Sequence, residues 1–175
     1  MIGAVTAYAK IKKEKIMNYR TLILLEGIVI NVADTEEDCC TLRVSMRTEE
    51  GAVTILVAGE TYVADNMRLR PGMRVAVFYD GSLPVPLIYP PQYRAVLITR
   101  LQRGQYVAFN YFDRNLLAED QSLQLNLANR TRIESANGQQ FSCSPGNHVL
   151  LVFYGITTRS IPPQTTPDRI IVFCE

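Results

Sequence analysis

The sequence PGMRVAVFY at residues 71–79 recurs in a second version, PGNHVLLVFY, at residues 145–154. In both copies a Pro-Gly turn precedes a run of Val, Leu, Phe and Tyr, which is typical of a buried β-strand. Two more anchors recur in the same order: AGETYV at residues 58–63 matches ANRTRI at 128–133, and PPQ at 90–92 matches PPQ at 162–164. Three anchors in one order predict two related units in tandem.

Strand patterns dominate the chain on both sides of these anchors. In the first half, residues 41–46 alternate between apolar and polar side chains, Glu49-Glu50-Gly51 forms a turn, and residues 53–58 return as the second strand of a hairpin. Further strands are expected at residues 25–32, 75–79 and 93–99, and in the second half at 106–112, 115–118, 123–127, 149–154 and 170–174. The polar stretch at residues 100–105 separates the halves. These patterns predict an N-terminal arm over residues 1–20 and two β units over 21–102 and 103–175.

Each unit contains five expected strands, with a Pro-Gly turn before the fourth strand and a long proline-bearing loop before the fifth. This order resembles the OB-fold, and the Thr…Pro-Gly-x-x-Val spacing is similar to that of small OB-like barrels of bacterial proteins that have no assigned function. The resemblance implies an all-β chain of two tandem OB-like five-stranded barrels, with a short N-terminal arm that could be helical. It also implies a binding surface at the loops after the first and fourth strands of each barrel.

The N-terminal residues are basic, whereas the rest of the chain has a small net negative charge. The 175-residue chain is 47% hydrophobic and 20% charged, which argues against intrinsic disorder, and its formal net charge is +1. All four lysines fall within residues 10–15, so residues 17–175 hold 14 Arg against 16 acids, a net charge of −2. We weigh three interpretations of residues 1–16: a misassigned start with the natural chain beginning at Met17, a basic arm that contacts a partner, or a solvated helix.

No stretch reads as a targeting or membrane-spanning segment. Residues 21–32 are apolar, but Glu26 and Gly27 interrupt them, and no run reaches the roughly 20 apolar residues that a spanning helix needs. The N-terminus is basic but has no uninterrupted apolar region followed by a cleavage site. We therefore expect no membrane association and a cytoplasmic location, or a cell or spore surface reached without a signal peptide.

The cysteines leave two interpretations open. Cys39, Cys40, Cys143 and Cys174 form no CxxC pair, so we expect no zinc site. They are either reduced thiols, or, in an oxidising environment, Cys39, Cys40 and Cys174 form crosslinks between subunits. The acidic residues 34–38 lack the spacing of an EF-hand loop and are expected to form a solvated turn.

The candidate binding residues gather around the proline-bearing loops. Aromatic rings beside prolines form a rigid apolar surface suited to stacking on a base or a sugar, or to docking a protein. The candidates are Tyr89, Tyr93, Arg94, Arg68, Arg70 and, in the second unit, Arg159. The alternative is that these loops fold back and cap the barrels. Nucleic acid is disfavoured because the body is net acidic.

Catalytic motifs are absent from the sequence. The only histidine, His148, lies five residues after Cys143, with no signature of a thiol nucleophile around either. We therefore expect a non-enzymatic structural or self-associating β protein that needs no cofactor, with itself as the partner in a homo-oligomer or filament. The alternative is a binding module for single-stranded nucleic acid or oligosaccharide.

Overall fold

The computed structural model describes residues 18–36 and 38–174. The predicted arm and the three interpretations of residues 1–16 therefore lie outside the described residues. The chain divides into two compact units between Leu101 and Gln102, and each unit is described by itself. The described residues contain no α-helix, only the two 3-10 turns Tyr19–Thr21 and Ala64–Asn66, so the prediction of an all-β chain is confirmed.

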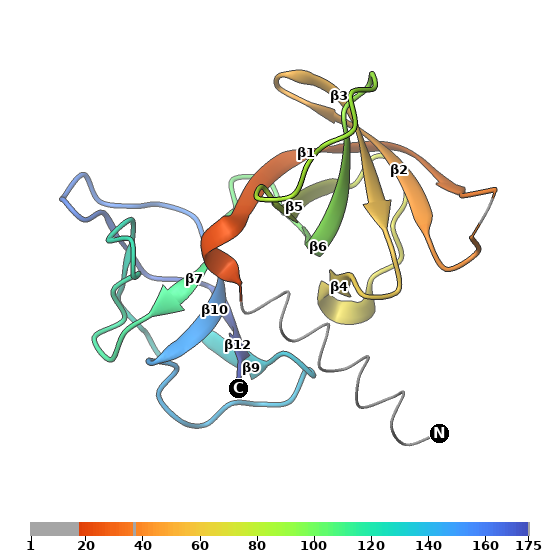
Figure 1. The fold of residues 1–175 in the computed structure, drawn as a ribbon. Helices are drawn as coiled ribbons and strands as arrows, with labels where there is room; N and C mark the ends of the chain where they lie inside the picture. The colour runs from red at the N-terminus through yellow and green to blue at the C-terminus, as the bar shows by residue number, and fades with distance from the viewer. Residues whose placement is uncertain (1–17, 37, 175) are drawn as a thin grey trace. The chain divides into compact units, whose positions relative to one another are not determined.

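The first unit is a closed five-stranded barrel (Figure 1). Its sheet has the order β3-β2-β1-β5-β6-β4, and an additional parallel pairing between β3 and β6 closes the ring. The other neighbours around the ring, β3 with β2, β2 with β1, β1 with β5 and β5 with β6, are antiparallel. The short strand β4 pairs with β6 in parallel. The strands are β1 (Leu22–Asp34), β2 (Leu42–Thr48), β3 (Gly51–Val57), β4 (Tyr62–Val63), β5 (Arg74–Asp80) and β6 (Gln92–Arg100).

The predicted hairpin is confirmed as β2 and β3, which pair from Leu42 opposite Val57 to Thr48 opposite Gly51. Gly51 has a φ of 133° at this turn, a conformation that a glycine adopts without steric cost. The inward side chains of this hairpin and its neighbours form the core; its fully buried members include Val29, Val44, Met46, Ile55, Val75 and Ile98.

β1 is long because it pairs with two partners in succession. Its first half pairs with β5 and its second half with β2, and the two pairings meet at Ile28. A Cβ atom added to Gly27 would lie 2.5 Å from the Arg47 carbonyl oxygen, so only glycine permits this close approach. Just beyond, the register shifts between Val29 and Asn31, and this bulge bends the strand around the barrel.

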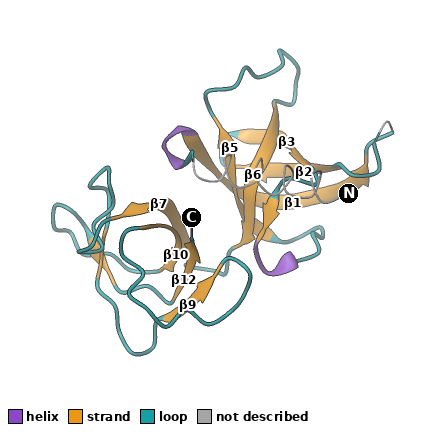
Figure 2. Ribbon diagram, turned by 60° about the horizontal axis from the view of Figure 1, so that its bottom comes forward, coloured by secondary structure: helices purple, strands orange, loops and turns teal. Residues whose placement is uncertain are grey.

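The second unit is built around an open sheet of four strands in the order β7-β10-β12-β9 (Figure 2). β8 and β11 form a separate parallel pair. Its core includes the fully buried Phe112, Leu150, Val152, Ile170 and Val172. The strands are β7 (Tyr106–Phe112), β8 (Gln124–Leu125), β9 (Arg132–Ser135), β10 (His148–Tyr154), β11 (Gln164–Thr165) and β12 (Arg169–Phe173).

The predicted second barrel is not seen, because this sheet is not closed. The strand expected at residues 115–118 is reduced to isolated bridges, Phe112 with Ala118 and Leu117 with Gln124. β11 and β12 together correspond to the single strand β6 of the first unit. Pro167 lies between β11 and β12 and has no N–H to donate to a neighbouring strand, so the strand is interrupted there.

The two units nevertheless share one hydrogen-bonding pattern at the sequence anchors. Thr61 Oγ1 accepts from the Ala58 amide at 3.0 Å and donates to the Ala95 carbonyl at 2.8 Å. Thr131 Oγ1 accepts from the Ala128 amide at 3.2 Å and donates to the Pro167 carbonyl at 2.8 Å. In each unit a threonine therefore forms a hydrogen bond within its own turn and a second one to the backbone of the last strand or of the segment just before it.

The proline anchors match in the same way. The Pro91 carbonyl accepts from the Thr54 amide at 2.8 Å, and the Pro163 carbonyl accepts from the Gln124 amide at 2.9 Å. In both units the peptide bond before the first proline of the Pro-Pro pair is cis, at Tyr89–Pro90 and at Ile161–Pro162. The loops that end at these prolines therefore occupy corresponding positions in the two units.

Candidate functional site

The loop between β5 and β6, residues 81–91, is named here the first loop. It begins with a turn in which Asp80 Oδ1 accepts from the Ser82 amide at 3.0 Å and from the Ser82 hydroxyl at 2.6 Å. Four prolines lie within it, and its tip carries apolar side chains in solvent: Leu87 is fully exposed and Tyr89 is 86% exposed. The first loop thus presents an apolar tip on a backbone that its prolines restrict.

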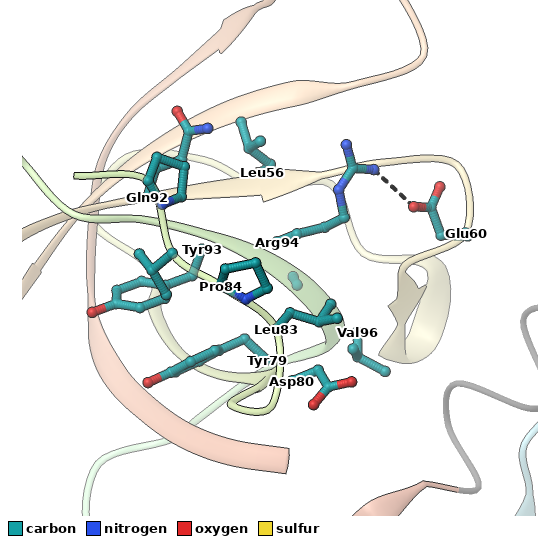
Figure 3. A pocket seen from close by; sticks show the side chains of 13 residues that line it. Leu56, Glu60, Tyr79, Asp80, Leu83, Pro84, Gln92, Tyr93, Arg94 and Val96 are labelled. Carbon is teal, nitrogen blue, oxygen red and sulfur yellow. Dashed lines mark hydrogen bonds and ion pairs between the residues drawn. The ribbon is translucent and has the colours of Figure 1, made fainter. Parts of the chain in front are cut away.

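A cavity of about 300 Å³ lies between this loop and the barrel wall (Figure 3). β3, β5 and β6 supply one side, with Leu56, Tyr79 and Tyr93 among the lining residues, and Leu83 and Pro84 of the first loop supply the other. This volume is at the lower end of the range of about 300–1,000 Å³ for small-molecule sites. The predicted proline-bearing loop therefore does border a cavity.

Two tyrosines stack at this cavity. The rings of Tyr79, near the end of β5, and Tyr93, near the start of β6, have centroids 4.3 Å apart and are tilted by 35°. Burial raises the pKa of the Tyr79 phenol above its ordinary value, and the neighbouring Tyr93 and Glu50 raise it further. The Tyr79 side chain is therefore neutral at physiological pH and offers an aromatic face with a hydrogen-bonding hydroxyl.

Among the described residues, the charged groups that line the cavity are one base and two acids. Arg94 extends toward Glu60 in Figure 3, and its guanidinium bonds the Glu60 carboxylate at 2.8 Å. The side chain of Arg94 is half exposed, so this ion pair is a surface pair of modest strength. With Asp80, the lining residues carry one more negative than positive charge.

The loop after β10, residues 155–163, is named here the second loop. Its apolar side chains are also in solvent, with Ile156 91% and Ile161 99% exposed. Thr158 holds it in shape: the Thr158 amide donates to the Gln164 carbonyl at 2.9 Å, and Thr158 Oγ1 accepts from the Gln164 amide at 2.9 Å. The Ser160 hydroxyl donates to the Pro162 carbonyl at 2.8 Å. The second loop is thus hydrogen-bonded within itself and exposes two isoleucines on either side of four polar residues, Thr157 to Ser160.

Beside the second loop, Tyr106 and Tyr154 form a further tyrosine pair, with centroids 5.9 Å apart and a tilt of 34°. Tyr154 ends β10 as Tyr79 lies near the end of β5. These rings line a hollow with Gly155 and Ile156 that is more open to solvent than the cavity.

The structure brings only some of the predicted binding residues together. Tyr93 and Arg94 line the cavity, whereas Tyr89 lies at the loop tip outside it. Arg68 and Arg70 are exposed on the connection before β5 and do not line the cavity. Arg159 is exposed at the middle of the second loop.

Sequence reasoning missed two important residues, Tyr79 and Glu60. The sequence pattern indicates only that Tyr79 ends a strand, although its position directly before the proline-bearing loop is a usable signal. Glu60 lies in the turn before β4 and reaches Arg94 only because β3 and β6 pair in parallel, which no local pattern reveals.

The cysteines are all exposed and unpaired. Cys39 and Cys40 lie in the turn between β1 and β2, where Asp38 Oδ2 accepts from the Thr41 hydroxyl at 2.5 Å and Asp38 Oδ1 accepts from the Cys40 amide at 2.8 Å. These hydrogen bonds, with that from Thr41 the larger contribution, lower the pKa of the Asp38 carboxyl. Crosslinking through Cys39, Cys40 or Cys174 stays a prediction.

The remaining chemistry-bearing groups are dispersed. Within residues 18–36 and 38–174, no group of three or more His, Cys, Asp or Glu side chains could hold a metal ion. His148 Nδ1 lies 2.8 Å from the Gly146 carbonyl oxygen, so this ring nitrogen is occupied by the backbone. None of the helices in the described part of the chain is long and apolar enough to cross a membrane.

No protein-family model matches the chain, and no curated protein matches it.

Proposed function

We propose that this chain is a non-catalytic structural protein that associates with copies of itself through the apolar tips of its two loops. One observation carries the proposal: Leu87 at the first loop and Ile161 at the second loop are almost wholly in solvent. An isolated exposed apolar side chain is ordinary, but here the corresponding loops of both units each expose more than one large apolar side chain, and clustered exposed apolar side chains are typical of interaction surfaces.

The rigidity of the loops supports the same function. Prolines restrict the first loop, and the second is held by hydrogen bonds from the Gln164 amide to Thr158 Oγ1 and from the Ser160 hydroxyl to the Pro162 carbonyl. A loop that is ordered before it binds loses little conformational entropy on docking, so more of the apolar contact remains as affinity.

For the fold we propose two tandem units of OB type. A closed five-stranded barrel with a long loop before its last strand supports this assignment for the first unit. The shared threonine and proline anchors support it for the second, as does the parallel pairing of β8 with β11, which corresponds to that of β3 with β6.

Light scattering coupled to size-exclusion chromatography tests the association. Leu87→Asp and Ile161→Asp each place a charge on an exposed tip and should weaken association about 30-fold or more, the size expected when a hot-spot side chain worth about 2 kcal/mol is lost. Ile30→Asp is the matched control, because Ile30 is an exposed apolar residue of β1 outside both loops. Equal effects of all three substitutions would contradict the proposal.

A second candidate function is a binding module for oligosaccharide or single-stranded nucleic acid. The stacked Tyr79 and Tyr93 beside the cavity favour it, since aromatic faces stack on sugars and bases. Glycan-array and single-stranded oligonucleotide titrations of the wild type and of Tyr93→Ala test it, with Tyr106→Ala as a control in the other unit. Absence of binding by the wild type would remove this candidate.

A further inference from the structure

The charged side chains that line the cavity already have partners within the chain. The Arg94 guanidinium bonds the Glu60 carboxylate at 2.8 Å, and Asp80 Oδ1 accepts from the amide and the hydroxyl of Ser82. A ligand with a phosphate or carboxylate group needs a cation to bind it. Arg94, the one base among the described residues that line the cavity, is occupied by Glu60. The cavity therefore favours an uncharged ligand.

The polar groups that remain at the cavity are uncharged and have no hydrogen-bond partner. Within residues 18–36 and 38–174, the hydroxyls of Tyr79 and Tyr93 and the side-chain amide of Gln92 make no hydrogen bond. The two hydroxyls point to the same side in Figure 3. Each of these three groups can both donate and accept a hydrogen bond, so together they match a ligand that carries hydroxyl groups.

The apolar walls of the cavity add a second requirement. The stacked rings of Tyr79 and Tyr93 lie beside Pro84 (Figure 3), so the ligand must also present an apolar face. The two rings are already in contact, with centroids 4.3 Å apart, so a nucleobase cannot insert between them. A sugar ring carries hydroxyl groups around its rim and C–H groups on its faces, and it satisfies both requirements.

We infer that the cavity binds an uncharged sugar ring, with the tyrosine pair against a C–H face of the sugar and Gln92 hydrogen-bonded to its hydroxyl groups. This inference rests on the second candidate function, a binding module, and selects oligosaccharide over single-stranded nucleic acid. It is independent of self-association through the loop tips, because Leu87 and Ile161 do not line the cavity.

Isothermal titration calorimetry of the full chain with neutral trisaccharides tests the ligand class. The probes are cellotriose, maltotriose and chitotriose, and single-stranded oligo(dT) is the charged comparison. At least one of the three sugars should bind, and the oligonucleotide should not. The affinity for that sugar should be the same at low and high salt, because the contact contains no ion pair.

Two substitutions test the assigned residues with the sugar that binds. Tyr93→Ala removes an aromatic ring and should weaken binding about tenfold or more, with Tyr106→Ala of the second unit as the matched control. Gln92→Ala removes one hydrogen-bonding amide and should weaken binding about threefold to tenfold. Gln140→Ala, at an exposed glutamine of the second unit, is its matched control and should leave the affinity unchanged. Thermal melting checks that each variant is folded.

The outcomes separate this inference from the second candidate function. Binding of oligo(dT) without binding of any of the three sugars would overturn the inference but leave the binding module standing. Binding of neither class would overturn both. Sugar binding that Gln92→Ala and Gln140→Ala weaken equally, or that falls steeply with salt, would overturn the assigned contact.

Discussion

The two units have the same anchors but differ in how their sheets end. In the first, β6 runs unbroken from Gln92 to Arg100, meets β3 at one end and closes a barrel. In the second, the corresponding region is divided into β11 and β12 around Pro167, and the sheet stays open. The threonine and proline contacts are therefore common to both units, whereas closure of the barrel requires an uninterrupted last strand and a full second strand.

The largest expected effects lie in the cores. Phe112→Ala should destabilise the second unit by about 3–5 kcal/mol, and Ile55→Ala should destabilise the first by about 2–5 kcal/mol, because both side chains are fully buried and their truncation leaves a cavity. Urea unfolding followed by hydrogen exchange, which reports each unit separately, is the measurement. If either substitution lowered the protection of backbone amides from hydrogen exchange equally in both units, the two units would not have separate cores.

The shared threonines should differ in strength. Thr61 is buried, so Thr61→Val leaves the Ala58 amide without its acceptor and should cost about 1–3 kcal/mol. Thr131 is partly exposed and water can replace its hydroxyl, so Thr131→Val should cost only about 0.5–1.5 kcal/mol. The free energies of unfolding in urea compare the two. A larger cost at Thr131 would contradict the argument that burial sets the strength of each threonine's hydrogen bonds.

Tyr79 should make the first unit sensitive to alkaline pH. Its folded pKa is raised above the ordinary value of 10.0, so the neutral phenol stabilises the fold below that pH, and this stability is lost as the pH rises through the folded pKa. Tyr79→Phe removes this dependence. The urea midpoint of the wild type should fall relative to that of Tyr79→Phe as the pH rises from neutral to alkaline; a constant difference would argue against the shift.

The smallest effect is expected at the β1–β2 turn. The pKa of Asp38 is lowered below the ordinary 3.8, so its contribution is complete above that value and is lost as the pH falls through the folded pKa. Asp38→Asn should therefore reduce stability slightly at neutral pH and converge with the wild type in acid. Because the turn is solvent-exposed, hydrogen exchange at the Cys40 and Thr41 amides is the appropriate measurement.

Much of the first unit could be predicted from the sequence because its signals are local. The alternation in residues 41–58 specifies the hairpin, and Gly51 specifies its turn. The second barrel that the sequence predicts is not seen. The apolar residues at 115–118 predict a strand, whereas Asp113 Oδ1 accepts from the Asn115 and Leu117 amides and folds this stretch into a turn.

The candidate site was only partly predictable. Tyr93 and the prolines are adjacent in sequence, so their association with one loop follows from the chain itself. The stacking of Tyr79 on Tyr93 and the contact of Glu60 with Arg94 depend on the pairing of β6 with β5 and β3, which brings residues together from distant positions.

The most direct test of self-association is the absolute mass of the wild-type chain by light scattering over a wide concentration range, in the presence of reductant so that no disulfide contributes. We predict a mass above 19.7 kDa that rises with concentration. A mass of 19.7 kDa at every concentration would contradict self-association through the loops.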